Sequence, residues 1–478
     1  MTRSKNAEWK PDARDAPDTQ GIIVSAYPKM LSAAFLMVNF NGQTGDIRPH
    51  PKGWLLDITP RITNAGGEKD RCINLSLSAP GLGALSALDE AAMLTFSRPF
   101  REGMTFGDRP RFLGDINPQA PSTWSWSDCA SNSNCVHALL MLYADSTPSL
   151  DSLVKAETAI LASFGLTLVS QILQQVDLDS AGRRHEHFGF ADGISQPVLV
   201  DADRVPVDER ALHEIAAGEI VLGKTNTYGL PAPGPMVSAS AIAARHLKGA
   251  ALKGFFDLGR NGTYLVVRQL KQDVAAFWRN MKIATNGLLD EEGNFATTDW
   301  LAKKAVGRTK TGDLLLPNGS SPDNETVFFE NDRAGFGCPV TSHVRRANPR
   351  DGLAPTKQDI GDIVQATNRH RIMRRGRIYG HPISDPFTDD GVDRGLVFVC
   401  MNSEIDRQFE FVQHTWLLNP MFGGAFGESD PLIGPRCPFS IPSQPVRQQP
   451  FLETYITARG GGYFFLPSLS ALRYLGEL

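Results

Sequence analysis

The chain has 478 residues, which is too long for a single small core and predicts two domains or two halves of one large unit. Hydrophobic residues make up 41% and charged residues 21%, as is typical of a soluble globular protein. The formal net charge of −4 argues against a general nucleic-acid-binding protein, since such proteins carry a basic excess that pairs with phosphates.

The first 20 residues are polar and of mixed charge, and we expect them to form a disordered arm. They contain no apolar segment of the kind found in a signal peptide. The apolar run at 30–40 is too short to span a bilayer and is interpreted as a buried strand. The sequence therefore predicts a cytoplasmic protein, and a secreted form whose signal has been removed is the alternative.

From residue 21 the chain alternates between segments with strand-like and helix-like patterns, which predicts an α+β fold. The expected elements of the N-terminal half, 21–210, are strands at 21–27, 33–42 and 135–145, helices at 81–104 and 149–165, and an extended segment at 167–175. Turn-forming residues are frequent at 198–240, and we place the boundary between the halves near 200–225.

In the C-terminal half, 211–478, a strand is again followed by a helix, so the two halves are expected to share one topology. The expected elements are strands at 262–270 and 394–402 and helices at 272–281 and 404–419, with loop-rich segments at 282–330 and 420–470. The six cysteines lack a CxxC pair and an accompanying pair of histidines, so buried free thiols are favoured over a zinc site.

Three motifs contain residues that could carry chemistry. HEHFGFADGISQP, 185–197, places Asp192 between two glycines, where an aspartate is commonly a turn former or helix cap. GCPVTSHVRRANPRD, 337–351, contains His343 beside two arginines that suit an anion. NRHRIMRRGRIYG, 368–380, is a basic run, and such runs usually form a solvated face or a nucleic-acid patch. Each motif alone decides nothing.

In combination, the three motifs resemble the dye-decolorising peroxidases, a superfamily of haem peroxidases. GFADG matches the GxxDG signature of that family, and ISQP extends the match. The second motif resembles the segment with the axial histidine, and the third resembles the segment with the distal arginine. REGM (101–104), LGD (113–115) and RGLVFVC (394–400) resemble scaffold segments, so the resemblance covers most of the chain from about 21 to 470.

The resemblance implies an α+β fold of two ferredoxin-like halves, of the dimeric α+β barrel type. The N-terminal half would supply the GxxDG segment and the C-terminal half most of the site for one haem b. The implied activity is oxidation of phenols and anthraquinone-type dyes by hydrogen peroxide through a ferryl intermediate. Hydrogen peroxide and aromatic reductants are the expected partners, with neither nucleic acid nor membrane, in a monomer or homo-oligomer.

On the distal side, the resemblance implies that Asp192 moves a proton and that an arginine stabilises developing negative charge. The distal arginine of the family stands five residues before the aromatic residue of the xYG ending. Tyr379 therefore assigns it to Arg374, and Arg375 is the alternative.

The residues around Asp192 are expected to contact the cofactor. Gly189 and Gly193 would let the backbone approach the porphyrin closely because they lack a Cβ. Phe190 and Ile194 are also expected to contact haem. Asn348 is expected just behind the residues that do so.

On the proximal side, the resemblance assigns His343 as the iron ligand. Arg345 is the expected partner of a haem propionate, with Arg346 as the alternative. A carboxylate normally supports an axial histidine, and Glu404 falls at the matching position. Asp406 is the other candidate there. An ordinary acid at a helix start would also explain Glu404.

Large dyes cannot enter a pocket sized for peroxide, so electrons would have to pass through the protein from its surface. Tyr379 matches a surface tyrosine that serves as an oxidation site in some family members. Trp416 is a second candidate relay. Core packing is the alternative role for both rings, and it is favoured only for Trp416. The long interval at 352–370 is typical of the larger, more elaborated members.

Two other classes of function remain at this stage. A haem carrier or iron-release protein would bind the same cofactor but would need no pair such as Asp192 and Arg374. A nucleic-acid-binding protein could use the basic run RHRIMRRGR, 369–377. The net charge and the absence of aromatic residues inside that run argue against it.

Overall fold

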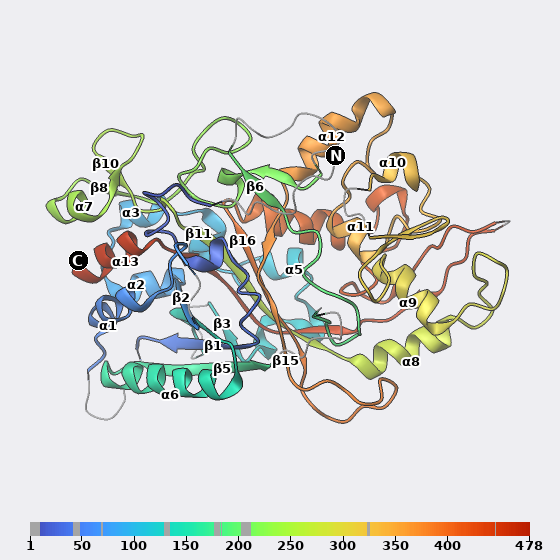
Figure 1. Ribbon diagram of the computed structural model, residues 1–478, viewed down its shortest axis with the longest axis horizontal. Helices are drawn as coiled ribbons and strands as arrows, with labels where there is room; N and C mark the ends of the chain where they lie inside the picture. The colour runs from blue at the N-terminus through green and yellow to red at the C-terminus, as the bar shows by residue number, and fades with distance from the viewer. Residues whose placement is uncertain are drawn as a thin grey trace.

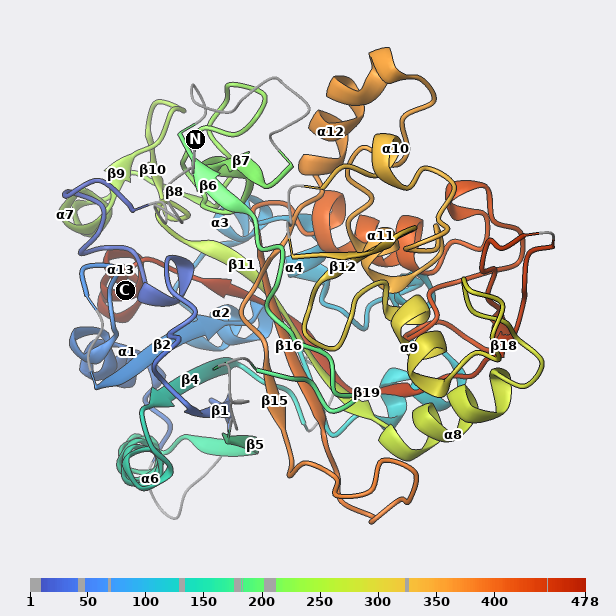
Figure 2. The same cartoon turned by 45° about the vertical axis from the view of Figure 1, so that its right-hand side comes forward.

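The computed structural model of the chain is shown in Figures 1 and 2. It describes residues 10–41, 48–67, 70–128, 134–175, 182, 184–201, 212–322, 326–444 and 446–478. The predicted boundary between residues 210 and 211 and the side chain of Cys129 lie outside the described residues, so both remain predictions.

One large sheet dominates the described residues. Its N-terminal strands are β1 (Ser32–Asn39), β2 (Arg71–Leu77), β3 (Trp126–Ser127), β4 (Ala138–Ala144) and β5 (Thr167–Gln175). Its C-terminal strands are β11 (Thr263–Gln272), β14 (Met373–Arg374), β15 (Arg377–Tyr379), β16 (Gly395–Asn402) and β19 (Ile456–Leu466). They form the order β14-β16-β11-β19-β2-β4-β1-β5, with β15 beside β16 and β3 beside β19.

Both halves of the sheet have the same strand order. In the N-terminal half the first main strand, β1, lies between β4 and β5, and in the C-terminal half β11 lies between β16 and β19. All the main strands pair antiparallel with their neighbours. This is the ferredoxin-like arrangement, so the α+β fold with two ferredoxin-like halves is confirmed. The halves meet where Phe465 of β19 pairs with Leu77 of β2.

Helices cover the sheet in two groups. The first lies mainly around the N-terminal half, and the second around the C-terminal half. The first consists of α1 (Pro51–Ile58), α2 (Ala79–Leu85), α3 (Glu90–Leu94), α4 (Arg98–Glu102), α5 (Arg109–Leu113), α6 (Thr147–Ser163), α7 (Ala241–His246) and α13 (Leu469–Glu477). The second consists of α8 (Val274–Ala284), α9 (Thr298–Val306), α10 (Phe328–Asn331), α11 (His343–Ala347) and α12 (Ile360–Asn368). In Figure 2, α1, α7 and α13 lie on the left, and α8, α9, α10 and α12 lie on the right.

Among the described residues, four small sheets lie outside the large one. Their strands are β6 (Val198–Val200) with β7 (Glu214–Ala216), β8 (Met236–Ser238), β10 (Phe255–Asp257) and β9 (Lys248–Gly249), β12 (Leu314–Leu316) with β13 (Gly319–Ser321), and β17 (Cys437–Pro438) with β18 (Phe451–Leu452). None of the helices in the described part of the chain is long and apolar enough to cross a membrane.

The strands are apolar on both faces because both faces are covered. In β1, Leu36 packs in the same core as Trp54 of α1. Its neighbour Phe35 points to the opposite face, where Ile22 and Ile23 complete a second core. All seven residues of β4 are buried, which explains why the unbroken apolar run at 135–145 predicted a strand correctly.

Two expected elements of the N-terminal half are wrong in detail. The strand expected at 21–27 is a single 3₁₀ turn, Gly21–Ile23, because its carbonyl groups accept hydrogen bonds from the guanidinium group of Arg375 instead of from a strand. The helix expected at 81–104 is divided into α2, α3 and α4. Ser86 ends α2 in the left-handed region at φ 49°, and Asp89 then caps α3.

The expected disordered arm is also wrong for residues 10–20. Asp15 is buried and contacts three cationic side chains, at 2.5 Å from Lys224, 2.9 Å from Lys248 and 3.2 Å from Arg260. Burial opposes ionisation of this carboxyl group, but the lysines outweigh it and hold its pKa far below the ordinary value. Long-range charge pairing therefore orders a segment whose own composition indicated disorder.

The helix expected at 404–419 is present, but it is wound as two π-helical segments, η8 (Asp406–Glu410) and η9 (Val412–Leu417). The segments expected to be loop-rich contain α9 and β19, the longest strand of the sheet. Five of the six cysteines are described, and all five are buried free thiols as predicted.

Asp128 gives the fold a defined pH dependence. This buried carboxyl group accepts backbone hydrogen bonds from Met104 (3.0 Å) and Tyr463 (2.8 Å). Burial raises its pKa from the ordinary 3.8 to about 6. Because the pKa is higher in the folded chain, the stability that this group contributes is complete below pH 3.8 and is lost as the pH rises through about 6.

We therefore expect the wild type to lose roughly 3 kcal/mol of unfolding free energy through Asp128 between pH 4 and 7. Asparagine at position 128 does not titrate, so the unfolding free energy of Asp128→Asn lacks this pH dependence. The difference in unfolding free energy between wild type and variant should therefore become smaller as the pH rises from 4 to 7. Urea unfolding of both proteins at several pH values measures this difference. A difference that stays constant with pH contradicts the prediction.

Candidate active site

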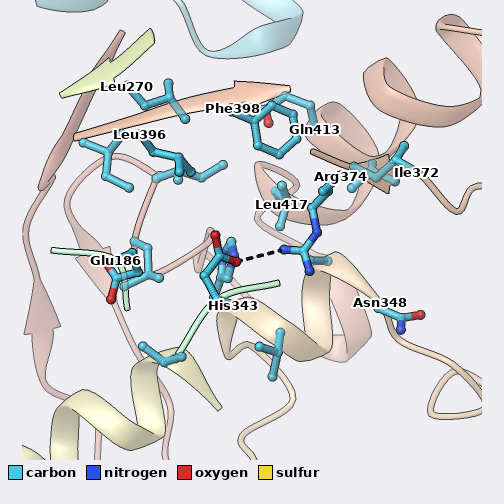
Figure 3. Close-up of a pocket in the computed structure, with 18 of the residues that line it drawn as sticks. Glu186, Leu270, His343, Asn348, Ile372, Arg374, Leu396, Phe398, Gln413 and Leu417 are labelled. Atoms are coloured by element: carbon cyan, nitrogen blue, oxygen red, sulfur yellow. Dashed lines mark ion pairs between the residues drawn. The ribbon is translucent and has the colours of Figure 1, made fainter. Parts of the chain in front are cut away.

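A cavity of about 290 Å³ lies between the sheet and the helices of the C-terminal half (Figure 3). Alternate residues of two strands form one wall, namely Leu270 of β11 and Leu396 and Phe398 of β16. Leu417 of η9 and Ile433 contribute to the rest of a mostly apolar lining. Many polar and charged side chains also line the cavity, and they define what it can bind.

His343 is the first residue of α11 and lines the cavity. Its Nδ1 atom lies 2.9 Å from Oδ2 of Asp430. Asp430 is buried, and its other oxygen accepts hydrogen bonds from the backbone of Leu432 (2.9 Å) and Ile433 (3.1 Å). Burial opposes ionisation, but His343 holds the pKa of Asp430 below its ordinary value. The pair fixes the ring and leaves Nε2 for a ligand.

The prediction that Glu404 supports His343 is wrong. Glu404 pairs with Arg407 at 2.8 Å, and Asp406 accepts a hydrogen bond from the backbone of Arg407. Asp430 takes the role instead. It lies 87 residues from His343 in a segment expected to be loop, and no local pattern marks it.

Asp192 and Arg374 meet in the same cavity, with 3.8 Å between Oδ1 and Nη1. Figure 3 shows this ion pair as a dashed line beside His343. Arg374 is held in place because its Nη2 atom donates to the carbonyl of Ile194 (2.6 Å) and its backbone N–H donates to Gln196 (3.0 Å). Each side chain of the pair is about one third exposed, 36% for Asp192 and 34% for Arg374.

Arg374 and its alternative, Arg375, are adjacent in the chain, so their side chains point to opposite faces of the sheet. Arg374 ends β14 and lines the cavity. The side chain of Arg375 points the other way, where it donates to the carbonyl groups of Ile22 (3.0 Å) and Ile23 (3.2 Å). Of the two candidates, the structure brings Arg374 to Asp192.

The glycines beside Asp192 adopt backbone conformations that other residues avoid, with φ of 94° at Gly189 and 81° at Gly193. A Cβ at either position would meet no atom of the described residues within 4 Å. The positive φ angles, and not a lack of space, therefore favour glycine at both positions. Their close approach to a porphyrin remains a prediction. Phe190 and Ile194 both line the cavity.

Arg345 is wrong as a cavity residue. It is buried and donates to the carbonyl groups of Asp332 (2.8 Å) and Cys338 (2.9 Å), so it supports the loop that precedes α11. Its alternative, Arg346, is also buried and donates to the carbonyl of Glu428 (2.5 Å). Neither guanidinium group is among the described residues that line the cavity.

Arg308 and Arg350 line the cavity in their place. Arg308 donates to Ser195 Oγ at 2.8 Å, and Arg350 contacts the same oxygen at 3.5 Å. Burial, together with the positive charges of Arg350 and Arg374, lowers the pKa of Arg308 to about 10. A bound anion would relieve this repulsion, so this part of the cavity fits the carboxylates of a cofactor.

The predictions for Tyr379, Trp416 and Asn348 also need correction. Tyr379 and Trp416 are each only 5% exposed, so neither is a surface relay. Tyr379 packs with Val397 in the core on the sheet face opposite the cavity. Trp416 packs edge-on against His370, with 5.3 Å between ring centroids. Asn348 lines the cavity itself instead of lying behind it.

Glu186 was missed by sequence reasoning, although it stands in the first motif. It lines the cavity opposite Arg374 in Figure 3. Burial raises its pKa to about 7, although hydrogen bonds from the backbone of Phe188 and Phe190 and from Gln272 favour the ionised form. The cavity thus contains a second carboxyl group near Asp192.

The site as a whole combines a histidine held by a carboxylate, a carboxylate–arginine pair in the same cavity, an apolar slot and an arginine pair suited to two anionic groups. These residues fit haem: the donor set supplies a neutral nitrogen ligand, and Arg308 and Arg350 suit the propionates. The class of protein that such a site defines is a haem peroxidase.

The comparisons with known proteins agree with this class. No protein-family model matches the chain. The dye-decolorizing peroxidase of Mycena epipterygia is 27% identical over 475 residues, which cover 87% of this chain and 78% of the relative. A solved DyP-type peroxidase from Anabaena sp. covers 99% of this chain and 100% of its own, with a TM-score of 0.74 and 24% identity. The deferrochelatase of Yersinia pestis is 28% identical over 173 residues, which cover 36% of this chain and 29% of that protein.

The structural similarity establishes the fold, and the sequence similarity extends over most of the chain. The chain is thus similar over most of its length to the dye-decolorising peroxidases, which are haem enzymes. The similarity to the deferrochelatase is partial, which favours the peroxidase over an iron-release protein.

Proposed function

We propose that this protein is a haem peroxidase that uses hydrogen peroxide to oxidise aromatic reductants such as phenols and anthraquinone-type dyes. The observation that carries the proposal is that His343, held by Asp430, shares one cavity with the Asp192–Arg374 pair. A binding protein needs only the histidine side of this arrangement. The acid–arginine pair is needed where peroxide is activated.

His343 would bind the iron through Nε2, because Nδ1 is engaged with Asp430. The hydrogen bond from Nδ1 to the carboxylate would make Nε2 a stronger electron donor to the metal. Arg308 and Arg350 would hold the propionates by charge-assisted hydrogen bonds. When bound, haem supplies the iron centre that accepts the oxidising equivalents of peroxide and passes them to the reductant.

Asp192 takes a proton from hydrogen peroxide and gives it to the oxygen that leaves as water. Arg374 stabilises the negative charge that develops on that oxygen as the O–O bond breaks. Its tie to the carbonyl of Ile194 keeps the guanidinium group in place before peroxide arrives. Phe188 and Phe190 limit the water around the acid. One peroxide then oxidises two molecules of reductant by one electron each, and two waters form.

Peroxide titration of the purified, haem-loaded protein tests this function. With a simple phenol or an anthraquinone dye present, we expect the protein to consume peroxide catalytically. Two molecules of reductant should each lose one electron for every molecule of peroxide consumed. The decay of the dye absorbance and of the phenol measures turnover. A haem-loaded protein that leaves both reductants unchanged, at any peroxide concentration, contradicts the proposal and favours a haem carrier.

A further inference from the structure

Glu186 lies at the start of the turn that leads to Asp192. Its two carboxylate oxygens accept hydrogen bonds from the backbone of Phe188 (2.9 Å) and Phe190 (2.8 Å). The backbone closes the same turn, because the N–H of Glu186 donates to the carbonyl of Phe190 (3.0 Å) and that of Gly189 donates to the carbonyl of Glu186 (2.8 Å). The carboxyl group therefore fills the centre of the turn.

The turn is fixed to the sheet through the same carboxyl group. Gln272, a buried residue at the end of β11, donates from Nε2 to Glu186 at 2.6 Å. Phe188 stacks on Phe277 of α8, with 4.3 Å between the ring centroids. Glu186 thus joins three backbone or side-chain donors, and it connects the turn to a strand that forms one wall of the cavity.

The position of Asp192 depends on this anchored turn. Phe190, which Glu186 holds, is two residues before Asp192 in the chain. The side chain of Asp192 meets its partner Arg374 only at 3.8 Å, and its carboxylate also accepts from the backbone of Gly193 at 2.6 Å. The backbone of the turn 186–190 therefore sets the location of Asp192 in the cavity more than contacts of its carboxylate with other segments do.

We propose that Glu186 is a positioning residue for Asp192, which holds the turn 186–190 against β11 through its carboxyl group. The inference rests on the proposed function, in which Asp192 handles the peroxide proton. Glutamine at position 186 keeps the size of the side chain but replaces one acceptor oxygen with an NH₂ group. The NH₂ group then faces a backbone N–H donor and cannot accept its hydrogen bond, so one of the two bonds that hold the turn is lost.

Hydrogen exchange in the haem-free protein tests the anchoring. We expect Glu186→Gln to speed exchange of the amides of Phe188 and Phe190. Asp128→Asn is the matched control, since Asp128 also accepts two backbone hydrogen bonds but lies outside the cavity. The control should speed exchange at Met104 and leave the turn unchanged. Unchanged exchange at Phe190 in Glu186→Gln overturns the proposal.

Kinetics of the haem-loaded protein test the link to Asp192. We expect Glu186→Gln to slow the reaction with peroxide by about 10- to 100-fold at normal haem content, as a displaced proton acceptor would. In an Asp192→Asn background the same change should cause no further loss, because the two residues act through one another. If Glu186→Gln slows the peroxide reaction in the Asp192→Asn background as much as it does in the wild type, Glu186 does not act through Asp192. That result overturns the inference.

Gln272→Leu provides a second variant in case Glu186→Gln does not fold. It removes the bond from β11 and leaves the turn's own hydrogen bonds in place, so a smaller slowing of the same kind is expected. An unchanged peroxide rate in this variant counts against the anchor. If Asp192→Asn does not slow the peroxide reaction, the proposed function fails. If Asp192→Asn slows it but neither Glu186→Gln nor Gln272→Leu does, only the role of Glu186 is refuted.

Discussion

Replacement of Asp192 by asparagine is expected to slow the reaction with hydrogen peroxide by about 10²- to 10⁴-fold while haem stays bound. The amide cannot accept the peroxide proton, but it has nearly the same size as the carboxyl group. Rapid mixing with peroxide, followed through the haem absorbance, measures the rate. Wild-type kinetics in this variant would remove Asp192 from the catalytic machinery.

Arg374→Leu should slow the same reaction by about 10²- to 10³-fold, because a preorganised positive charge is lost. Arg375→Leu is the matched control. The two arginines are adjacent in sequence, but the side chain of Arg375 donates to the carbonyl groups of Ile22 and Ile23 on the other face of the sheet. This control should reduce stability and leave the peroxide rate of the folded protein intact. The reverse pattern would show that the assignment of Arg374 is wrong.

His343→Ala is expected to abolish most haem binding, because only porphyrin packing and the arginine contacts then remain. The ratio of haem absorbance to protein absorbance after reconstitution measures the loss. His414→Ala, at an exposed position on η9, is the control and should bind haem normally. Normal haem content with an unchanged visible spectrum in His343→Ala would exclude His343 as the ligand.

The carboxylate behind the ligand gives a graded test of the same assignment. Asp430→Asn keeps a hydrogen-bonding partner for Nδ1 but removes its charge, so haem affinity should fall by about 10- to 100-fold without being abolished. Glu404→Gln should have no such effect, since Glu404 contacts Arg407 instead. Equal haem affinity in the Asp430 variant and the wild type would contradict the role of this pair.

Local patterns predicted the parts of the fold whose hydrogen bonds and burial follow a simple period. The extended segment expected at 167–175 is β5 with the same bounds, and the helix expected at 149–165 is α6, Thr147–Ser163. Strand β19 was hidden by its glycines at 460–462. Those glycines exist because other parts of the chain approach closely: a Cβ at Gly461 would lie 2.7 Å from Met104 Sδ. That contact joins residues far apart in sequence.

The sequence by itself pointed to the family and to Asp192, His343 and Arg374 as candidate site residues, because the three motifs in combination resemble those of the dye-decolorising peroxidases. Only the tertiary structure decided which side chains face the cavity. Strand alternation sent Arg374 to one face of the sheet and Arg375 to the other, and the carboxylate beside His343 came from 87 residues away. Likewise, Arg308 and Arg350 line the cavity, whereas the predicted Arg345 does not. The physical reason is that partners across a cavity are set by how distant elements pack, and a linear pattern records only the period of each element.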